Sequence, residues 1–247
     1  MAAPRRLLTV NAVVRKIVPW LTRWLRAMQR ERALLVFSKT GVIPLFPTYL
    51  WMNKLSPDEY TSLNARLRQA LKKLRHDDAK ENTDSFIQTH TKLHTLPEFQ
   101  DLNRFILGAA LGVSDFLKLA ATNMEITGCW ANINLQGVQH KAHTHPNNFL
   151  SGVYYLDAPA GTASIVFSDP RPQAYVISPI VEISTPENAG KAVITVEEGL
   201  LILFPAWLSH SVENSPLEQE RVSISFNLMF SDFTKNVSPT KWQGKLS

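Results

Sequence analysis

Three histidines lie within six residues of one another, and a fourth lies far downstream at the end of a predicted strand. The first three are His140, His143 and His145, and the distant one is His210. Side chains two residues apart in a β-strand point to the same face, so His143 and His145 would present two imidazoles together. Neutral imidazole is the commonest metal ligand in proteins. We therefore predict a metal site formed by His143, His145 and His210.

A second candidate for chemistry follows His210 by eleven residues. Arg221 and Ser223 alternate with Val222 and Ile224, so the polar pair faces inward if the apolar side chains face the other way. A guanidinium buried inside a barrel is costly unless it is paired. Its planar fork can bind a carboxylate through two hydrogen bonds, and a serine hydroxyl can add a third. The pattern indicates a site for a dicarboxylate, and the alternative is an arginine on an exposed strand.

Helices are predicted in the first half of the chain. Ser56, Pro57 and Glu59 form a helix start, with serine as the N-cap, proline in the first turn and glutamate in a capping box. Leucines at helical spacing continue to a predicted end near residues 76–78. A second helix is predicted from about residue 95 to about residue 119.

Short β-rich runs separated by turn residues begin at residue 123. The predicted strands are 125–135, 150–156, 163–167, 174–183, 192–196, 200–204 and 221–230. Strands at this spacing without intervening helices favour an antiparallel sandwich or barrel. Trp130 and Trp207 flank the proposed site elements and are candidate walls of its pocket.

These motifs, in this order, resemble the iron(II)/2-oxoglutarate-dependent dioxygenases, in particular those similar to prolyl hydroxylases. The resemblance covers roughly residues 123–232, and it is carried by 137–145, 151–156 and 198–204. More narrowly, the stretches 143–155, 168–171 and 204–210 resemble a subgroup of 2-oxoglutarate–Fe(II) oxygenases that mostly lack assigned substrates.

The resemblance implies a mainly β fold with N-terminal helices, whose core is a double-stranded β-helix, or jelly roll. It implies Fe(II) held by His143, His145 and His210, with 2-oxoglutarate and O2 as co-substrates. Arg221 and Ser223 would hold the distal carboxylate of 2-oxoglutarate. The side chains that could add hydrogen bonds to this co-substrate are Asn134, His140 and Tyr155. The implied reaction hydroxylates an unassigned peptidyl or small-molecule substrate and releases succinate and CO2.

One position departs from the family pattern. His145 stands where the family has Asp or Glu, so the site has three neutral imidazoles in place of two and an anion. Asp157 or Asp169 could instead supply a carboxylate, and His140 could replace His143, although neither fits the spacing as well. Two other functions stay open: a cupin-type metal-dependent dioxygenase that does not use 2-oxoglutarate, and a metal-free β-sandwich binding module.

The chain is expected to have four regions. These are a basic amphipathic N-terminal segment (1–40), a helical support region (41–122), the catalytic core (123–235) and a C-terminal tail (236–247). Residues 1–30 hold seven basic side chains and no acidic one, and the remaining 19 basic and 21 acidic side chains leave a net charge of −2. A nucleic-acid partner is therefore not expected. A homodimer is left open.

The cellular location is expected to be cytoplasmic. Cys129 is the only cysteine, so the chain has no internal disulfide, and a reducing compartment is the default. The acid-free, arginine-rich segment 1–30 would indicate a mitochondrion if it is a presequence, but it would equally suit a helix on a membrane surface or one packed on the body. No apolar run reaches the roughly 18 residues that a membrane-spanning helix needs.

Overall fold

The computed structural model describes residues 21–29, 38–78, 86–120, 123–134, 138–159, 164–213 and 219–234. The chain divides into two compact units, residues 1–48 and 49–247. Residues 21–29 form a helix in the first unit. Most of the candidate presequence and the tail at 236–247 lie outside the described residues, so the four-region division stays a prediction. All of the candidate site lies in the second unit.

Helix α2 (Pro57–Asp78) begins where the capping box predicts. The Ser56 hydroxyl donates to Glu59 Oε2 at 2.8 Å, and the Glu59 backbone N–H donates to Ser56 Oγ at 3.4 Å. One face of this helix is buried through Leu63, Leu67 and Leu71. The predicted first helix is therefore confirmed at its start and in its buried face.

The second predicted helix is also present, preceded by two short 3-10 turns, η1 (Leu93–Thr95) and η2 (Pro97–Phe99). Helix α3 (Gln100–Leu117) follows them and ends at Lys118, which takes a left-handed conformation with φ of 56°. Leu102, Ile106 and Val113 are fully buried on its inner face. The predicted helix start at Thr95–Pro97 therefore lies three to five residues before the first residue of α3.

The strands of the described residues form two antiparallel sheets. The larger sheet has the order β1-β8-β5-β10-β3-β2 and the smaller one β4-β9-β6-β7. The larger sheet contains β1 (Trp51–Lys54), β2 (Phe86–Gln88), β3 (Met124–Asn134), β5 (Leu150–Asp157), β8 (Leu200–Pro205) and β10 (Arg221–Phe230). The smaller sheet contains β4 (His140–His143), β6 (Ile165–Ser168), β7 (Lys191–Ile194) and β9 (His210–Val212). A short helix, α4 (Ser231–Thr234), follows β10.

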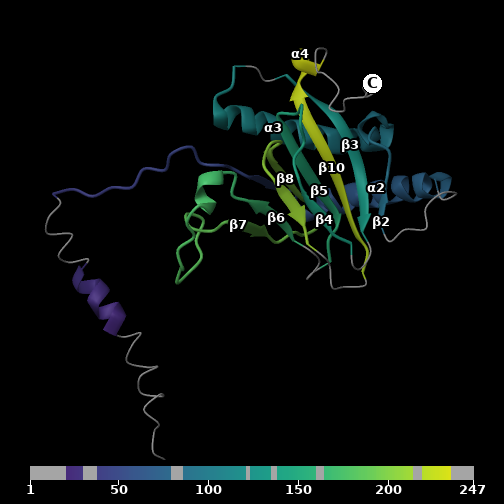
Figure 1. The fold of residues 1–247 in the computed structure, drawn as a ribbon. Coiled ribbons are helices and arrows are strands. Elements are labelled where there is room, and N and C mark those ends of the chain that lie inside the picture. The colour runs from purple at the N-terminus through teal and green to yellow at the C-terminus, as the bar shows by residue number, and fades with distance from the viewer. Residues whose placement is uncertain are drawn as a thin grey trace, which may run out of the picture. The chain divides into compact units, whose positions relative to one another are not determined.

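Each face of the larger sheet packs against a different layer. One face meets α2 and α3, where Ile224 and Phe226 of β10 join the buried leucines of the helices (Figure 1). On the other face, Tyr155 and Phe204 pack against Phe167 of the smaller sheet. The inner faces of the two sheets therefore form a second core, and the candidate site lies at its edge.

Gly152 in β5 is required by the packing of this sheet. A Cβ atom at this position would lie 2.3 Å from Cζ of Phe226 and 2.7 Å from the carbonyl oxygen of Ile202. Because the Phe226 ring crosses the strand directly over this glycine, no larger residue fits without moving backbone. The glycine thereby allows β5, β8 and β10 to pack closely.

The sequence predicts most of the β core correctly, with one wrong strand and four omissions. Residues 174–183 do not form a strand: η3 (Pro172–Tyr175) starts this stretch, and Ile177 and Ile180 are 79% and 102% exposed. Strand propensity needs a packed, paired surface, which these residues lack in the described structure. Strands β1, β2, β4 and β9 are not among the predicted strands, and β1 and β2 lie in the region 41–122 that was expected to be a helical support.

None of the helices in the described ranges combines the length and the apolar character that crossing a lipid bilayer requires.

Candidate metal and co-substrate site

The paired strands β3 and β10 form one wall of the site. Their register places Arg221 opposite Asn134, Ser223 opposite Asn132, and Ser225 opposite Trp130. The alternate residues of β10, such as Ile224, pack against the helices. Arg221 and Ser223 are each only 4% exposed. The two side chains therefore face the interior, as the alternation of polar and apolar residues predicts.

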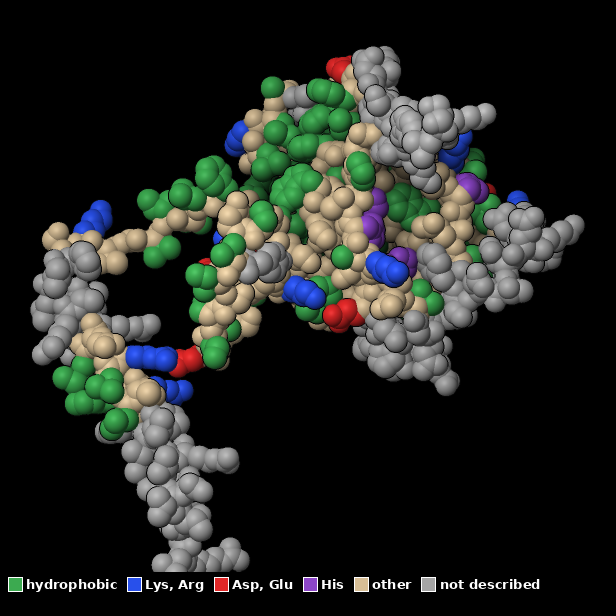
Figure 2. Space-filling view, viewed as in Figure 1, with side chains coloured by type: hydrophobic (Ala, Val, Ile, Leu, Met, Phe, Trp, Pro, Cys, Tyr) green, Lys and Arg blue, Asp and Glu red, His purple; other side chains and the backbone are tan. Residues whose placement is uncertain are grey.

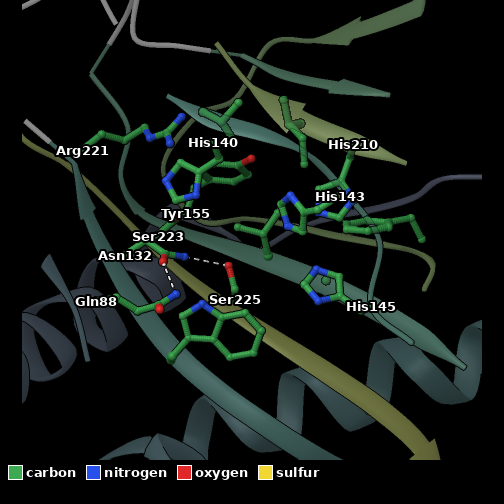
Figure 3. A pocket seen from close by; sticks show the side chains of 16 residues that line it. Gln88, Asn132, His140, His143, His145, Tyr155, His210, Arg221, Ser223 and Ser225 are labelled. Atoms are coloured by element: carbon green, nitrogen blue, oxygen red, sulfur yellow. Dashed lines mark hydrogen bonds between the residues drawn. The ribbon is translucent and has the colours of Figure 1, made fainter. Parts of the chain in front are cut away.

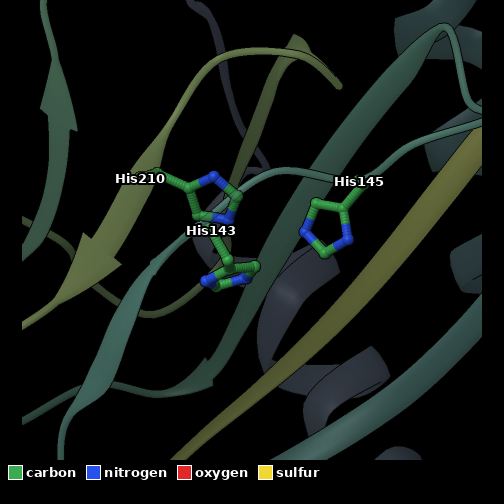
Figure 4. Close-up of side chains that lie close together, drawn as sticks. All are labelled: His143, His145 and His210. Atoms are coloured by element: carbon green, nitrogen blue, oxygen red, sulfur yellow. The ribbon is translucent and has the colours of Figure 1, made fainter.

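The histidines of the proposed metal site converge at one edge of the smaller sheet, where β4 pairs with β9. His143 and His210 are direct partners in the β4–β9 ladder, with ring centroids 4.3 Å apart. The His145 ring lies 5.0 Å from that of His143 and 5.2 Å from that of His210. One ring nitrogen from each residue lies within 4.8 Å of the others (Figure 4). Three imidazoles so placed could hold one metal ion.

His145 reaches the cluster by a route that the alternation argument does not describe. Strand β4 ends at His143, so His145 lies beyond the strand. Its backbone N–H donates to the carbonyl oxygen of Ala206 at 2.8 Å, in the turn that joins β8 to β9. The imidazole is thus positioned by a backbone contact to the same turn that leads into His210.

Backbone carbonyls select the tautomer of two of the imidazoles. Nδ1 of His143 lies 2.7 Å from the carbonyl oxygen of Lys141, and Nδ1 of His210 lies 3.0 Å from that of Leu208. A carbonyl can only accept, so each Nδ1 carries the proton and each Nε2 keeps its lone pair. Burial lowers the pKa of His145 and of His210 to about 4. Both rings are therefore neutral near pH 7, the form that binds a metal.

The cavity between these groups has a volume of about 100 Å³. Arg221 lies at one end and the three histidines at the other, with Tyr155 and His140 between them (Figure 3). Tyr155 is fully buried, and burial raises the pKa of its phenol. Burial also lowers the pKa of the Arg221 guanidinium, and the nearby Tyr155 opposes that effect. Arg221 thus makes one end of the cavity cationic, the three histidines line the other end, and the wall between them is largely buried.

Asn134 and His140 act as a pair in the structure. Oδ1 of Asn134 lies 3.3 Å from Nε2 of His140, and Asn134 itself is absent from the cavity lining. Burial, and then the charge of Arg221, lower the pKa of His140. Asn134 therefore orients His140, and only His140 faces the cavity.

The carboxylates considered as alternative ligands are engaged elsewhere. Asp157 accepts from Nε of Arg68 at 2.8 Å, and Asp169 accepts from the guanidinium of Arg171 at 2.7 Å. Across the described ranges, no carboxylate joins the three imidazoles. His145 thus occupies the third position of the cluster.

Three polar residues of the pocket, Gln88, Asn132 and Ser225, were not predicted from the sequence. The Gln88 amide donates to Oδ1 of Asn132 at 3.1 Å, and the Asn132 amide donates to the hydroxyl of Ser225 at 2.9 Å. Ser225 and Asn132 could have been found, because they continue the inward-facing alternation from Ser223 and Asn134. Gln88 carries no such signal, since β2 is three residues long and pairs only with the end of β3.

Comparisons with known proteins agree on one class. Residues 128–227 match the family model described as "Putative 2OG-Fe(II) oxygenase". This segment contains all three histidines, Arg221 and Ser223. No curated protein matches the chain.

Several solved structures have a similar fold. A prolyl-4-hydroxylase from Pseudomonas putida matches with a TM-score of 0.51 and 13% identity, over 74% of this chain and 93% of that one. AviO1 from Streptomyces viridochromogenes Tue57 matches with 0.52 and 14%, over 74% and 90%. HygX from Streptomyces hygroscopicus, solved with nickel and 2-oxoglutarate bound, matches with 0.51 and 10%, over 74% and 83%. The shared fold is the double-stranded β-helix, and residues 128–227 are similar to the 2OG-Fe(II) oxygenases.

Proposed function

We propose that this protein is an Fe(II)- and 2-oxoglutarate-dependent dioxygenase that hydroxylates a substrate with release of succinate and CO2. One observation carries the proposal. Three imidazoles and a buried guanidinium occupy opposite ends of a single small cavity. This arrangement matches a molecule with a metal-chelating end and a carboxylate end.

The residues present fit the iron. His143 and His210 offer Nε2 atoms whose tautomers are set by backbone carbonyls, and His145 adds a third imidazole. Imidazole is a good ligand for divalent iron, and three ligands on one side leave coordination positions for small molecules. When bound, the iron would supply the activation of O2 that couples decarboxylation of 2-oxoglutarate to hydroxylation.

The opposite end of the cavity fits a carboxylate. Arg221 would bind the distal carboxylate of 2-oxoglutarate through its guanidinium, and the Ser223 hydroxyl would donate one further hydrogen bond. Tyr155 and His140 line the space between that end and the histidines, where they would orient the co-substrate. Asn134 would hold the His140 ring in place.

An anaerobic Fe(II) titration tests this function directly. The full chain is titrated with Fe(II) with and without 2-oxoglutarate, and the visible spectrum is followed for the weak charge-transfer band of the chelate. We expect stoichiometric iron binding and a band that needs both components. Arg221→Ala serves as a matched variant that should keep the iron and bind 2-oxoglutarate more weakly.

The same titration separates the other two functions. Iron binding without any effect of 2-oxoglutarate would favour a cupin-type enzyme. Absence of iron binding would favour a metal-free binding module. Either result would overturn the proposal.

Location and assembly complete the proposal. We place the protein in a reducing compartment, with the cytoplasm as the default, because its single cysteine, Cys129, is free and buried. A homodimer stays a prediction that sedimentation of the purified chain can test.

A further inference from the structure

The inward-facing row of the β3–β10 ladder continues past the proposed iron site. Beyond the pair formed by Ser225 and Trp130, the next pair in register is Asn227 and Gly128. Asn227 lies four residues beyond Ser223, which is about 13 Å along an extended strand. Because Gly128 has no side chain, the wall is hollow at this pair.

A second hollow of about 560 Å³ lies at this point. It is separate from the 100 Å³ cavity, and Trp130 lines both. The Trp130 ring lies 6.0 Å from the His145 ring, centroid to centroid. A molecule resting against Trp130 in the larger hollow would therefore lie next to the proposed iron, on the side away from Arg221.

The groups that line this hollow are polar but almost uncharged. Six of its nine lining residues are asparagine, threonine or glutamate: Asn147, Asn148, Asn227, Thr91, Thr127 and Glu125. No lysine or arginine is among the nine. A phosphate or carboxylate would thus meet Glu125 without a compensating cation, which disfavours an anionic substrate. In this respect the hollow differs from the 2-oxoglutarate end of the small cavity, where Arg221 provides a cation.

Amide, hydroxyl and carboxylate groups suit a ligand that both donates and accepts many hydrogen bonds. Sugar hydroxyls do both, and the face of an indole provides apolar contact for the C–H face of a sugar ring. Oδ1 of Asn148 already accepts from the Thr127 hydroxyl at 2.6 Å, and Oδ1 of Asn227 accepts from the Ser151 hydroxyl at 2.7 Å. These bonds fix the two amides in orientation before any ligand arrives.

We propose that this hollow binds the primary substrate, and that the substrate is a polyhydroxylated, non-anionic molecule of glycosyl type. The inference rests on the proposed oxygenase function. Trp130 provides the flat contact surface next to the iron, and the missing side chain of Gly128 leaves space for the substrate. Asn148, Asn227 and Glu125 bind its hydroxyl groups. The small cavity, in contrast, has room for the co-substrate alone.

Gly128→Leu is the sharpest test of the location. A Cβ atom at Gly128 would lie 3.6 Å from Trp130 and 3.9 Å from the carbonyl oxygen of Thr91, so a side chain can enter the hollow without a clash at its base. Gly112→Leu on α3 is the matched control, because nothing lies within 4 Å of a Cβ added there. Glu125→Ala, an exposed position, provides a second variant should the larger change impair folding.

The experiment uses the full chain loaded with Fe(II) and 2-oxoglutarate. Calorimetric binding and 2-oxoglutarate consumption are measured with sucrose, maltotriose, kanamycin, glucose 6-phosphate and a proline-containing peptide. We expect at least one of the first three compounds to bind and to raise 2-oxoglutarate consumption at least tenfold. Glucose 6-phosphate should not do so. Gly128→Leu should lose this effect at least tenfold and keep the charge-transfer band, Gly112→Leu should match the wild type, and Glu125→Ala should weaken binding at least threefold.

Several results would overturn the inference. Stimulation by the peptide alone, or no binding of any of the three uncharged or cationic glycosides, would refute the substrate class. Glycoside binding that is unchanged in both Gly128→Leu and Glu125→Ala would refute the location. A wild type without the charge-transfer band would instead refute the oxygenase function on which the inference rests.

Discussion

His143 and His210 are direct partners across the β4–β9 ladder, yet they differ in their access to solvent. His210 is 6% exposed and packs against Phe204, with ring centroids 4.7 Å apart, whereas His143 is exposed. Histidine side chains reach the molecular surface on the face shown in Figure 2. An ion held between the two rings would have one rigid, buried ligand and one at the surface. We therefore expect chelators to remove it without unfolding the protein.

The buried ligand provides the first prediction. His210→Ala should abolish Fe(II) binding and succinate formation, because it removes the imidazole with the most constrained position. His90→Ala, an exposed histidine outside the site, is the control and should bind iron normally. Iron content by absorption spectroscopy and succinate by chromatography measure the outcome. Unchanged turnover in His210→Ala would remove this residue from the metal site.

A second prediction concerns the departure from the family pattern. His145→Asp should bind Fe(II) at least as tightly as the wild type, because it adds an anion to a site of neutral ligands. The Asn side chain in His145→Asn has the same size as Asp but no charge. This variant should bind Fe(II) at least about tenfold more weakly than His145→Asp. Competition with a coloured chelator measures both affinities. Binding by both variants that equals the wild type would show that position 145 is not a ligand.

The third prediction concerns the carboxylate end of the cavity. Arg221→Ala should raise the 2-oxoglutarate KM by about tenfold or more, since a charge-assisted bidentate pair contributes about 1.5–3 kcal/mol. Arg221→Lys keeps the charge but loses the fork, and should fall between the alanine variant and the wild type. Steady-state kinetics at saturating iron provide the measurement. An unchanged KM in Arg221→Ala would contradict the assignment of this residue.

The fourth prediction uses the single cysteine. Cys129 is fully buried, and burial raises the pKa of its thiol to about 12. The reactive species is the thiolate, which is therefore scarce at pH 8 in the folded protein. Iodoacetamide should label the native chain negligibly and the urea-unfolded chain once, as read by mass spectrometry. Rapid labelling of the native chain would contradict the buried position of this residue.

The last prediction concerns a hydrogen bond that ties α2 to the larger sheet. The Tyr154 hydroxyl donates to Oδ1 of Asn64 at 2.6 Å, and both side chains are buried. Tyr154→Phe should lower the free energy of unfolding by about 1–3 kcal/mol, because a buried acceptor loses its partner. Tyr49→Phe, at a partly exposed tyrosine, should change it by less than about 0.5 kcal/mol. Urea denaturation measures both, and equal effects would show that the bond adds no stability.

Short-range sequence patterns predicted part of this fold and of the candidate site correctly. The capping box at Ser56 and Glu59 predicts the start of α2, because helix capping involves residues three positions apart. Alternation predicts that Arg221 and Ser223 share a face, because the strand period of two holds wherever a strand forms. The strand predicted at 174–183 was wrong, since apolar composition cannot report whether a partner strand is available.

By itself, the sequence determined the candidate ligands, the order of most core elements and the inward-facing row on β10, because these depend on residue type and short-range periodicity. Only the tertiary structure decided which groups meet. The contact of His145 with Ala206 and the engagement of Asp157 by Arg68 join residues far apart in the chain. The pairing of β2 with β3 and the residues that line the hollow beside Gly128 likewise bring distant parts of the chain together. Such contacts depend on how whole sheets and helices pack, and no local pattern encodes that packing.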